Sequence, residues 1–118
     1  MSIAVKICGV DKVATLKAAA EYGVDYVGFV FFNRSPRNLT LEKARKLSSE
    51  TPQNICKVAL FVNPTNAEIL NVTSSMKFDL IQLHGDESPL RVREIKEHIK
   101  LPIMKAIKLG DSEDLNCI

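Results

Sequence analysis

The chain has 118 residues, of which 46% are apolar and 25% charged, which is typical of an ordinary folded protein and excludes a disordered one. Lys and Arg outnumber Asp and Glu by 16 to 14, and no stretch gathers the basic residues that a nucleic-acid-binding face requires. No apolar run approaches the roughly 18 residues of a membrane span, and the N-terminus does not resemble a signal peptide, so we expect a cytoplasmic protein that binds neither nucleic acid nor membrane.

The first part of the sequence alternates short apolar runs with a helical pattern. Ile3 to Cys8 predicts a first strand. Asp11 can cap the following helix, whose apolar residues recur every three or four positions until Gly23 marks its end. Asp25 to Phe32 is continuously apolar, which favours a strand buried on both faces, as in a parallel sheet.

The same alternation continues in the middle of the chain. Thr40 is expected to cap a second helix, Leu41 to Ser49, and Ile55 to Val62 predicts a third strand. The run Thr65 to Glu68 has the Thr-x-x-Glu spacing of a capping box, so a third helix begins there.

The last part adds two strands and one helix. Phe78 to Leu83 predicts a fourth strand. Ser88 then caps a helix that has Pro89 at its first position and runs to about His98. Pro102 to Ile107 predicts a fifth strand, and the chain closes on a polar segment, Gly110 to Ile118.

This pattern of five strands alternating with four helices predicts a parallel α/β sheet with right-handed crossovers. Two architectures accept it: an open doubly wound sheet, with strand order 2-1-3-4-5 in its flavodoxin-like form, and a (β/α)8 barrel, with sequential order. A complete barrel needs about 200 residues or more. In both architectures ligands bind at the carboxyl ends of the strands.

Polar residues at those strand ends are therefore the candidate site residues, although each is a weak signal alone. Cys8 ends the first strand, but a lone cysteine is more often a small buried hydrophobe. Arg37 follows the second strand and could be a solvated loop residue, and His84 follows the fourth and could serve a structural hydrogen bond. For Asp86 and Glu87 we favour a helix-dipole role ahead of Ser88.

Five motifs at these strand ends resemble, in order and spacing, the phosphoribosylanthranilate isomerases. Lys-Ile-Cys-Gly and Gln-Leu-His-Gly are the most specific of them. The matches extend from about Val5 to Lys108 and comprise residues 6–9, 28–31 with 35–37, 60–63, 82–85 and 105–107. The resemblance implies a TIM-barrel-type fold in which residues 1–118 are a single domain, the N-terminal portion of a (β/α)8 barrel.

The resemblance also implies a reaction and residue roles. The family carries out an Amadori rearrangement in tryptophan biosynthesis, in which a phosphorylated ribosyl anthranilate opens its ring and shifts a proton from C2′. Such chemistry needs a general acid and a general base. By resemblance Cys8 is the base, Arg37 grips the substrate, through its anthranilate carboxylate, and His84 is a substrate-site residue. The resemblance implies no metal and no organic cofactor.

Lys6 has the same strand parity as Cys8, so the two side chains are expected on one face, about 7 Å apart. A nearby ammonium favours the thiolate form of a cysteine. Alternatively, Lys6 closes the barrel floor or pairs with an acid elsewhere.

In this family the general acid belongs to a sixth strand, and the loops that bind the substrate phosphate follow the seventh and eighth strands. Residues beyond Ile118 would be required to supply these groups, and in this the chain departs from the family. Asp111 and Glu113 match neither, and Cys56 and Cys117 match no functional position and are interpreted as structural. We therefore expect a truncated chain, inactive alone, that self-associates through its open barrel edges.

Two other functions fit the pattern of strands and helices. One is a non-catalytic open α/β assembly or binding module. The other is a Schiff-base aldolase that uses Lys6 or Lys105.

Overall fold

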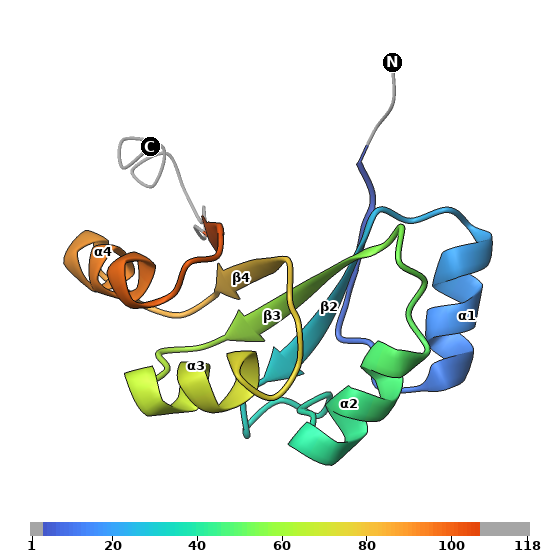
Figure 1. Ribbon diagram of the computed structural model, residues 1–118, viewed down its shortest axis with the longest axis horizontal. Helices are drawn as coiled ribbons and strands as arrows, with labels where there is room; N and C mark the ends of the chain where they lie inside the picture. The colour runs from blue at the N-terminus through green and yellow to red at the C-terminus, as the bar shows by residue number, and fades with distance from the viewer. Residues whose placement is uncertain (1–3, 107–118) are drawn as a thin grey trace.

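The computed structural model describes residues 4–106, so Ile3, Ile107, Asp111, Glu113, Cys117 and the predicted polar segment Gly110 to Ile118 lie outside the described residues. Within residues 4–106 the chain forms five strands and four helices in strict alternation (Figure 1). The elements are β1 Lys6–Cys8, α1 Val13–Glu21, β2 Tyr26–Phe31, α2 Leu41–Ser49, β3 Cys56–Phe61, α3 Asn66–Thr73, β4 Leu80–Leu83, α4 Pro89–His98 and β5 Ile103–Lys105.

The five described strands form one parallel sheet in the order β1-β2-β3-β4-β5. This is the sequential order of a barrel, and it excludes the flavodoxin-like order that the sequence left open. Figure 1 shows the helices following one another around the outer side of the curved sheet, from α1 to α4. The predicted fold class, five parallel strands and four helices of a TIM-barrel type, is therefore confirmed for residues 4–106.

The two faces of the sheet have different partners because side chains alternate along each strand. Val27, Phe29 and Phe61 face outward and pack with residues from all four helices in one buried core. The remaining members of that core on the central strands and helices include Ala59, Ile81, Leu83, Leu16, Leu47, Ile69 and Ile95. The alternate residues on β2 to β4, which include Gly28, Leu60 and Gln82, lie on the inner face.

Three of the four helix starts are capped as the sequence predicts. The side-chain oxygens of Thr40, Thr65 and Ser88 accept hydrogen bonds from the backbone N–H three residues later, at 3.2, 3.1 and 3.1 Å. The prediction for Asp11 is wrong. Helix α1 begins after Lys12, which has no side-chain cap, so the Asp11 carboxylate stands one residue too early to cap the first turn.

The strands begin later than the apolar runs suggested, and acidic side chains bond backbone amides at the amino edge of the sheet. Asp25 accepts a hydrogen bond from the backbone N–H of Val5, and Asp79 accepts one from Lys57, both at 2.8 Å. Phe78, predicted to open the fourth strand, packs in the core before β4 starts. The helices found within residues 4–106 are all too short or too polar to cross a membrane.

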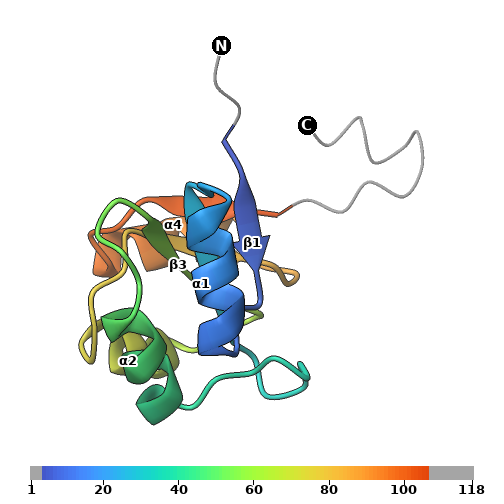
Figure 2. The ribbon, with the colours of Figure 1, turned by 90° about the vertical axis from the view of Figure 1, so that its right-hand side faces the viewer.

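Strand β1 lies at one edge of the described sheet, with α1 beside it (Figure 2). An apolar groove of about 510 Å³ runs between the two elements and is lined by Val5, Ile7, Ala18, Tyr22 and others. Val5 and Tyr22 are exposed there, at 45% and 88% of their surface. This edge is where a barrel strand would add to β1.

Candidate functional site

The carboxyl edge of the sheet brings Cys8 and Arg37 together. Cys8 is the last residue of β1, and Arg37 comes from the loop between β2 and α2. The Arg37 guanidinium Nη1 donates a hydrogen bond to the backbone carbonyl of Cys8 at 3.3 Å. Two residues that are 29 positions apart in the sequence therefore meet at the end of β1.

Gly9 makes this approach possible. Its φ of +77° is unfavourable for any residue with a side chain. A Cβ atom at this position would lie 2.6 Å from Arg37 Cδ, well inside van der Waals contact. The backbone amides of Gly9 and Val10 both donate to the carbonyl of Gly28, at 3.0 and 3.1 Å, which fixes the turn after β1.

Cys8 and Lys6 lie against the same glycine of the neighbouring strand. A Cβ on Gly28 would be 3.3 Å from Cys8 Sγ and 3.5 Å from Lys6 Cε. The two side chains therefore share the inner face, as their parity predicts. Among residues 4–106 no carboxylate lies within ion-pair distance of Lys6. The alternative role of Lys6, pairing with an acid elsewhere in the chain, therefore finds no acid among the described residues.

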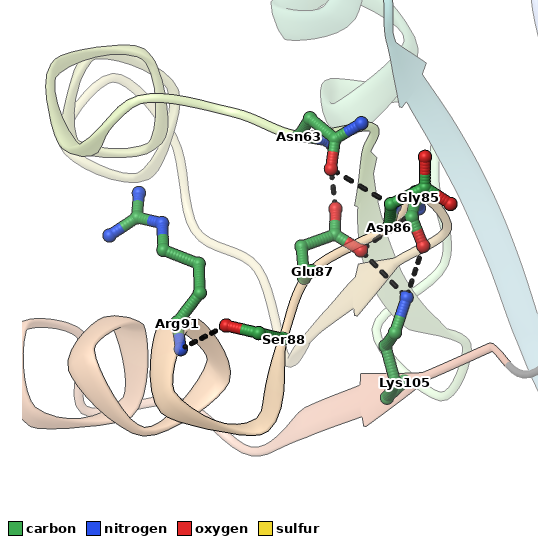
Figure 3. Close-up of polar contacts among 7 residues, drawn as sticks. All are labelled: Asn63, Gly85, Asp86, Glu87, Ser88, Arg91 and Lys105. Atoms are coloured by element: carbon green, nitrogen blue, oxygen red, sulfur yellow. Dashed lines mark hydrogen bonds and ion pairs between the residues drawn. The ribbon is translucent and has the colours of Figure 1, made fainter.

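A second cluster links the ends of β3, β4 and β5 through one buried carboxylate (Figure 3). The side chain of Glu87 is only 1% exposed. Its Oε2 accepts the backbone N–H of Asn63 at 2.8 Å, and its Oε1 accepts the N–H of Gly85 at 2.9 Å. The Lys105 ammonium donates to the same Oε1 at 2.7 Å and also to the Gly85 carbonyl.

The interpretation of Glu87 as a helix-dipole residue is therefore wrong. The carboxylate turns inward, away from the start of α4, because Ser88 already caps that helix and Lys105 offers a counter-charge. Burial raises the pKa of Glu87, but the hydrogen bond from Lys105, those from backbone amides and the Lys105 charge outweigh it. The net pKa lies below the ordinary carboxyl value, so Glu87 is held as an anion.

His84 is presented by a turn that this cluster surrounds. The His84 backbone N–H donates to the carbonyl of Phe61 at 2.9 Å, and the Asp86 N–H donates to Asn63 Oδ1 at 3.0 Å. Asn63 adopts a φ of +46°, in the left-handed region, and its side chain contacts this turn through that hydrogen bond. The imidazole is exposed beside a depression of about 760 Å³, which Asp86 and Lys105 also line. Within the described residues no hydrogen bond joins His84 to Cys8 or Arg37.

Gln82, the first residue of the Gln-Leu-His-Gly motif, is a further inner-face residue to which the sequence analysis gave no role. It is 8% exposed, and its side-chain Oε1 has no hydrogen-bond partner among the residues that the structure describes. Its neighbours in the sheet register are Leu60 and Met104. A buried glutamine between apolar neighbours could have been noticed from strand parity alone, since Gln82 alternates with the outward-facing Ile81 and Leu83.

Lys105 also carried a signal in the sequence. It follows Met104 at the end of β5, and its register partner is Leu83, so its ammonium reaches the turn that follows β4. A partly buried cation requires an anion nearby, and Glu87 is the acid that the turn after β4 supplies.

The sequential sheet, with Cys8, Arg37 and His84 at its carboxyl edge, defines a TIM-barrel-type site. The family model described as N-(5'phosphoribosyl)anthranilate (PRA) isomerase matches residues 5–117. The chain belongs to this isomerase family.

Individual relatives give the same result. The N-(5'-phosphoribosyl)anthranilate isomerase of Paracoccus denitrificans is 46% identical over the whole of this chain and 55% of its own length. That of Rhodopseudomonas palustris strain BisB5 is 49% identical over 98% of this chain and 53% of its own. The chain thus spans about half the length of the curated relatives it matches.

Solved structures agree with the fold. The crystal structure of phosphoribosyl anthranilate isomerase from Thermotoga maritima superposes with a TM-score of 0.90 at 34% identity, covering 98% of this chain and 56% of that one. A second isomerase structure, in complex with reduced 1-(o-carboxyphenylamino)-1-deoxyribulose 5-phosphate, has the same TM-score and identity and is covered over 59% of its length. A third, of monomers generated from the dimeric Thermotoga maritima enzyme, has a TM-score of 0.87 at 35% identity, covering 98% of this chain and 59% of that one.

Proposed function

We propose that this chain carries the N-terminal part of a phosphoribosylanthranilate isomerase site. The reaction is the Amadori rearrangement of N-(5'-phosphoribosyl)anthranilate to 1-(2-carboxyphenylamino)-1-deoxyribulose 5-phosphate in tryptophan biosynthesis. The observation that carries the proposal is the placement of Arg37 against the end of β1, where its guanidinium contacts the Cys8 carbonyl. The relative crystallised with the reduced 5-phosphate compound supports a small phosphorylated substrate.

In this proposal Cys8 is the general base that takes the proton from C2′ of the opened sugar. Its thiol lies on the inner face beside Gly28 and Lys6, and no cofactor is needed for the proton shift. Arg37 binds the anthranilate carboxylate, for which a planar guanidinium with several N–H donors is well suited. His84 contacts the substrate from the neighbouring strand ends, at the depression after β4.

We further propose that residues 1–118 alone do not catalyse the reaction at a useful rate. The rearrangement also needs a general acid, which in this family belongs to a sixth strand. Glu87 is the one carboxylate among residues 4–106 that is buried, and its lowered pKa keeps it deprotonated and unsuited to donate a proton. Binding energy from the substrate phosphate is also needed to hold the sugar against Cys8.

The remaining parts of the proposal concern the state of the chain. Residues 1–118 act as a single domain in the cytoplasm, and they self-associate because β1 and β5 each pair on one side only among the described strands. An aldolase using Lys105 is disfavoured, since its ammonium is held by a carboxylate and a carbonyl and is a poor nucleophile in that state.

The test is an assay of isomerisation, followed by loss of fluorescence of the anthranilate substrate. The 118-residue chain is compared with a chimaera in which the C-terminal part of the Paracoccus denitrificans relative follows Ala106. We expect turnover in the chimaera, and a kcat about 10²–10⁴-fold lower after Cys8→Ala, the usual contribution of a general base. Near-normal turnover by that variant would refute the role of Cys8 as the base, since the thiol is exposed and Cys8→Ala removes little packing.

A second arm of the test examines inactivity and assembly. Turnover by the 118-residue chain within tenfold of the chimaera would refute the proposed inactivity and would make Asp86 and Asp111 the first candidates for the acid. Light scattering measures self-association, and a monomer at all concentrations would refute it.

A further inference from the structure

Glu87 bonds within its own turn and to two segments that are distant in the sequence, the loop after β3 and the end of β5, and none of its hydrogen bonds is with Cys8 or Arg37. Its two carboxylate oxygens accept backbone hydrogen bonds from the loop after β3 and from the turn after β4. The Lys105 ammonium, from the end of β5, pairs with the carboxylate and also holds the Gly85 carbonyl (Figure 3). The Glu87–Lys105 pair therefore bonds both the N–H and the C=O group of Gly85 in this turn.

The turn that is clamped in this way is the one that carries His84. Gly85 follows His84 directly, and a Cβ at Gly85 would lie 2.8 to 2.9 Å from Asn63 atoms, so the two loops are in close contact. Asn63 closes the cluster by accepting the Asp86 N–H, a bond that does not involve Glu87 at all. A displacement of Glu87 would therefore reach Gly85 directly and Asp86 through Asn63, the two residues that follow His84 in the turn.

We infer that Glu87, held by Lys105, is a positioning residue that presets the His84–Asp86 turn at the substrate depression. It acts through the backbone of the turn and does not touch the substrate. The part of this inference that concerns substrate rests on the proposed function. The part that concerns the turn stands on the hydrogen bonds alone.

The experiment measures amide hydrogen exchange by NMR in the full 118-residue chain. Glu87→Gln keeps the shape of the side chain but removes the charge that pairs with Lys105. We expect exchange at Gly85 and Asn63 to become roughly 10- to 100-fold faster, because hydrogen bonds to charged groups are the stronger ones. Exchange at Asp86 should accelerate as well, although its N–H does not contact Glu87.

Three controls separate positioning from general stability. Glu97→Gln makes the same charge change on the exposed face of α4 and should leave these amides unchanged. Ile69→Val lowers the stability of the core without touching the cluster, so it should not single out the 84–86 turn. The N–H of Arg91, which donates to Ser88 in the first turn of α4, should stay protected in Glu87→Gln.

Lys105→Met provides an independent variant if Glu87→Gln does not fold. It leaves the Glu87 anion without its counter-charge and should loosen the same turn, and the double variant should be no looser than the more disturbed single one. Unchanged exchange at Asp86 in both single variants would overturn the inference. So would acceleration of Arg91 to the same extent, since Glu87 would then serve the helix as a whole.

Binding of the reduced 1-(o-carboxyphenylamino)-1-deoxyribulose 5-phosphate to the chimaera distinguishes this inference from the proposed function. We expect the Kd to rise at least tenfold in Glu87→Gln and to change less than twofold in Ile69→Val and Glu97→Gln. Equal affinity in Glu87→Gln and the parent would overturn the positioning role. Absence of binding by the parent would overturn the proposed function and leave the exchange result to decide the role of the turn.

Discussion

Two glycines with similar backbone angles provide a matched test of the contact between Arg37 and the end of β1. Gly9 and Gly23 have φ values of +77° and +72°. A Cβ at Gly23 would meet nothing within 4 Å, whereas one at Gly9 would lie 2.6 Å from Arg37 Cδ. Replacing each by alanine therefore imposes the same backbone strain at both sites but a steric clash at Gly9 alone.

The expected losses of stability follow from these distances. A left-handed conformation costs a residue with a side chain about 1–2 kcal/mol. The smaller entropy of the unfolded alanine chain offsets about 0.4–1 kcal/mol of this. Gly23→Ala should therefore lower the free energy of unfolding by about 1 kcal/mol. In Gly9→Ala the Arg37 side chain must leave its rotamer and its bond to Cys8, which adds about 1–2 kcal/mol.

Urea unfolding of the chain and its variants, followed by circular dichroism, measures these losses, provided that the slopes against urea stay equal. The key control is Arg37→Ala, in which the clash has no partner. In that background the losses from the two glycine replacements should become equal. Equal losses in the parent background, or a difference that survives the removal of Arg37, would refute the argument that Gly9 is needed for the approach of Arg37.

Three further predictions concern other parts of the chain. The pKa of Glu87 is lower in the folded chain than its ordinary value of 4.5, so the stability that its ionised form contributes is complete above that pH and is lost as the pH falls through the folded pKa. The difference in unfolding free energy between the parent and Glu87→Gln should therefore shrink on acidification below about 4.5. A constant difference in unfolding titrations between pH 7 and 3 would contradict this. Ser88→Ala should lower the free energy of unfolding by about 1 kcal/mol, measured by urea unfolding, because the first turn of α4 loses its cap; no change would mean that water replaces the hydroxyl fully. Gln82→Met should leave the stability unchanged or raise it by about 1 kcal/mol, since the buried Oε1 has no described partner, and a loss of more than about 1 kcal/mol in thermal unfolding would show that this oxygen is bonded.

The elements of the fold were predictable where the determining interaction is local. Thr40, Thr65 and Ser88 cap helices through amides three residues away, so the sequence alone places those helix starts. The start of α1 was misplaced because its N-cap position falls on Lys12, one residue after Asp11, without any side-chain cap. Strand order could not be derived from the residues, since both α/β architectures share the same local pattern.

In the candidate site, too, some features could be predicted from the sequence and others could not. The resemblance to the isomerase family pointed to Cys8, Arg37 and His84, whose roles stay predictions, and the structure places Arg37 against the end of β1. The ion pair between Glu87 and Lys105 was missed because it joins residues 18 positions apart through two turns whose backbone the sequence does not specify. The local context of Glu87, just before a helix cap, pointed instead to a dipole role.

The sequential order of the sheet has a consequence for how the chain acquires its structure. Every strand from β2 to β5 is hydrogen-bonded to the strand that precedes it in the chain. A nascent polypeptide leaving the ribosome would therefore find the partner of each new strand already made, and none of these pairings has to wait for a later segment. We expect folding to be vectorial, one βα unit after another. Protease resistance of ribosome-stalled chains should then appear in steps as α2, α3 and α4 emerge, whereas a single step after β5 would show that the arc folds only as a whole.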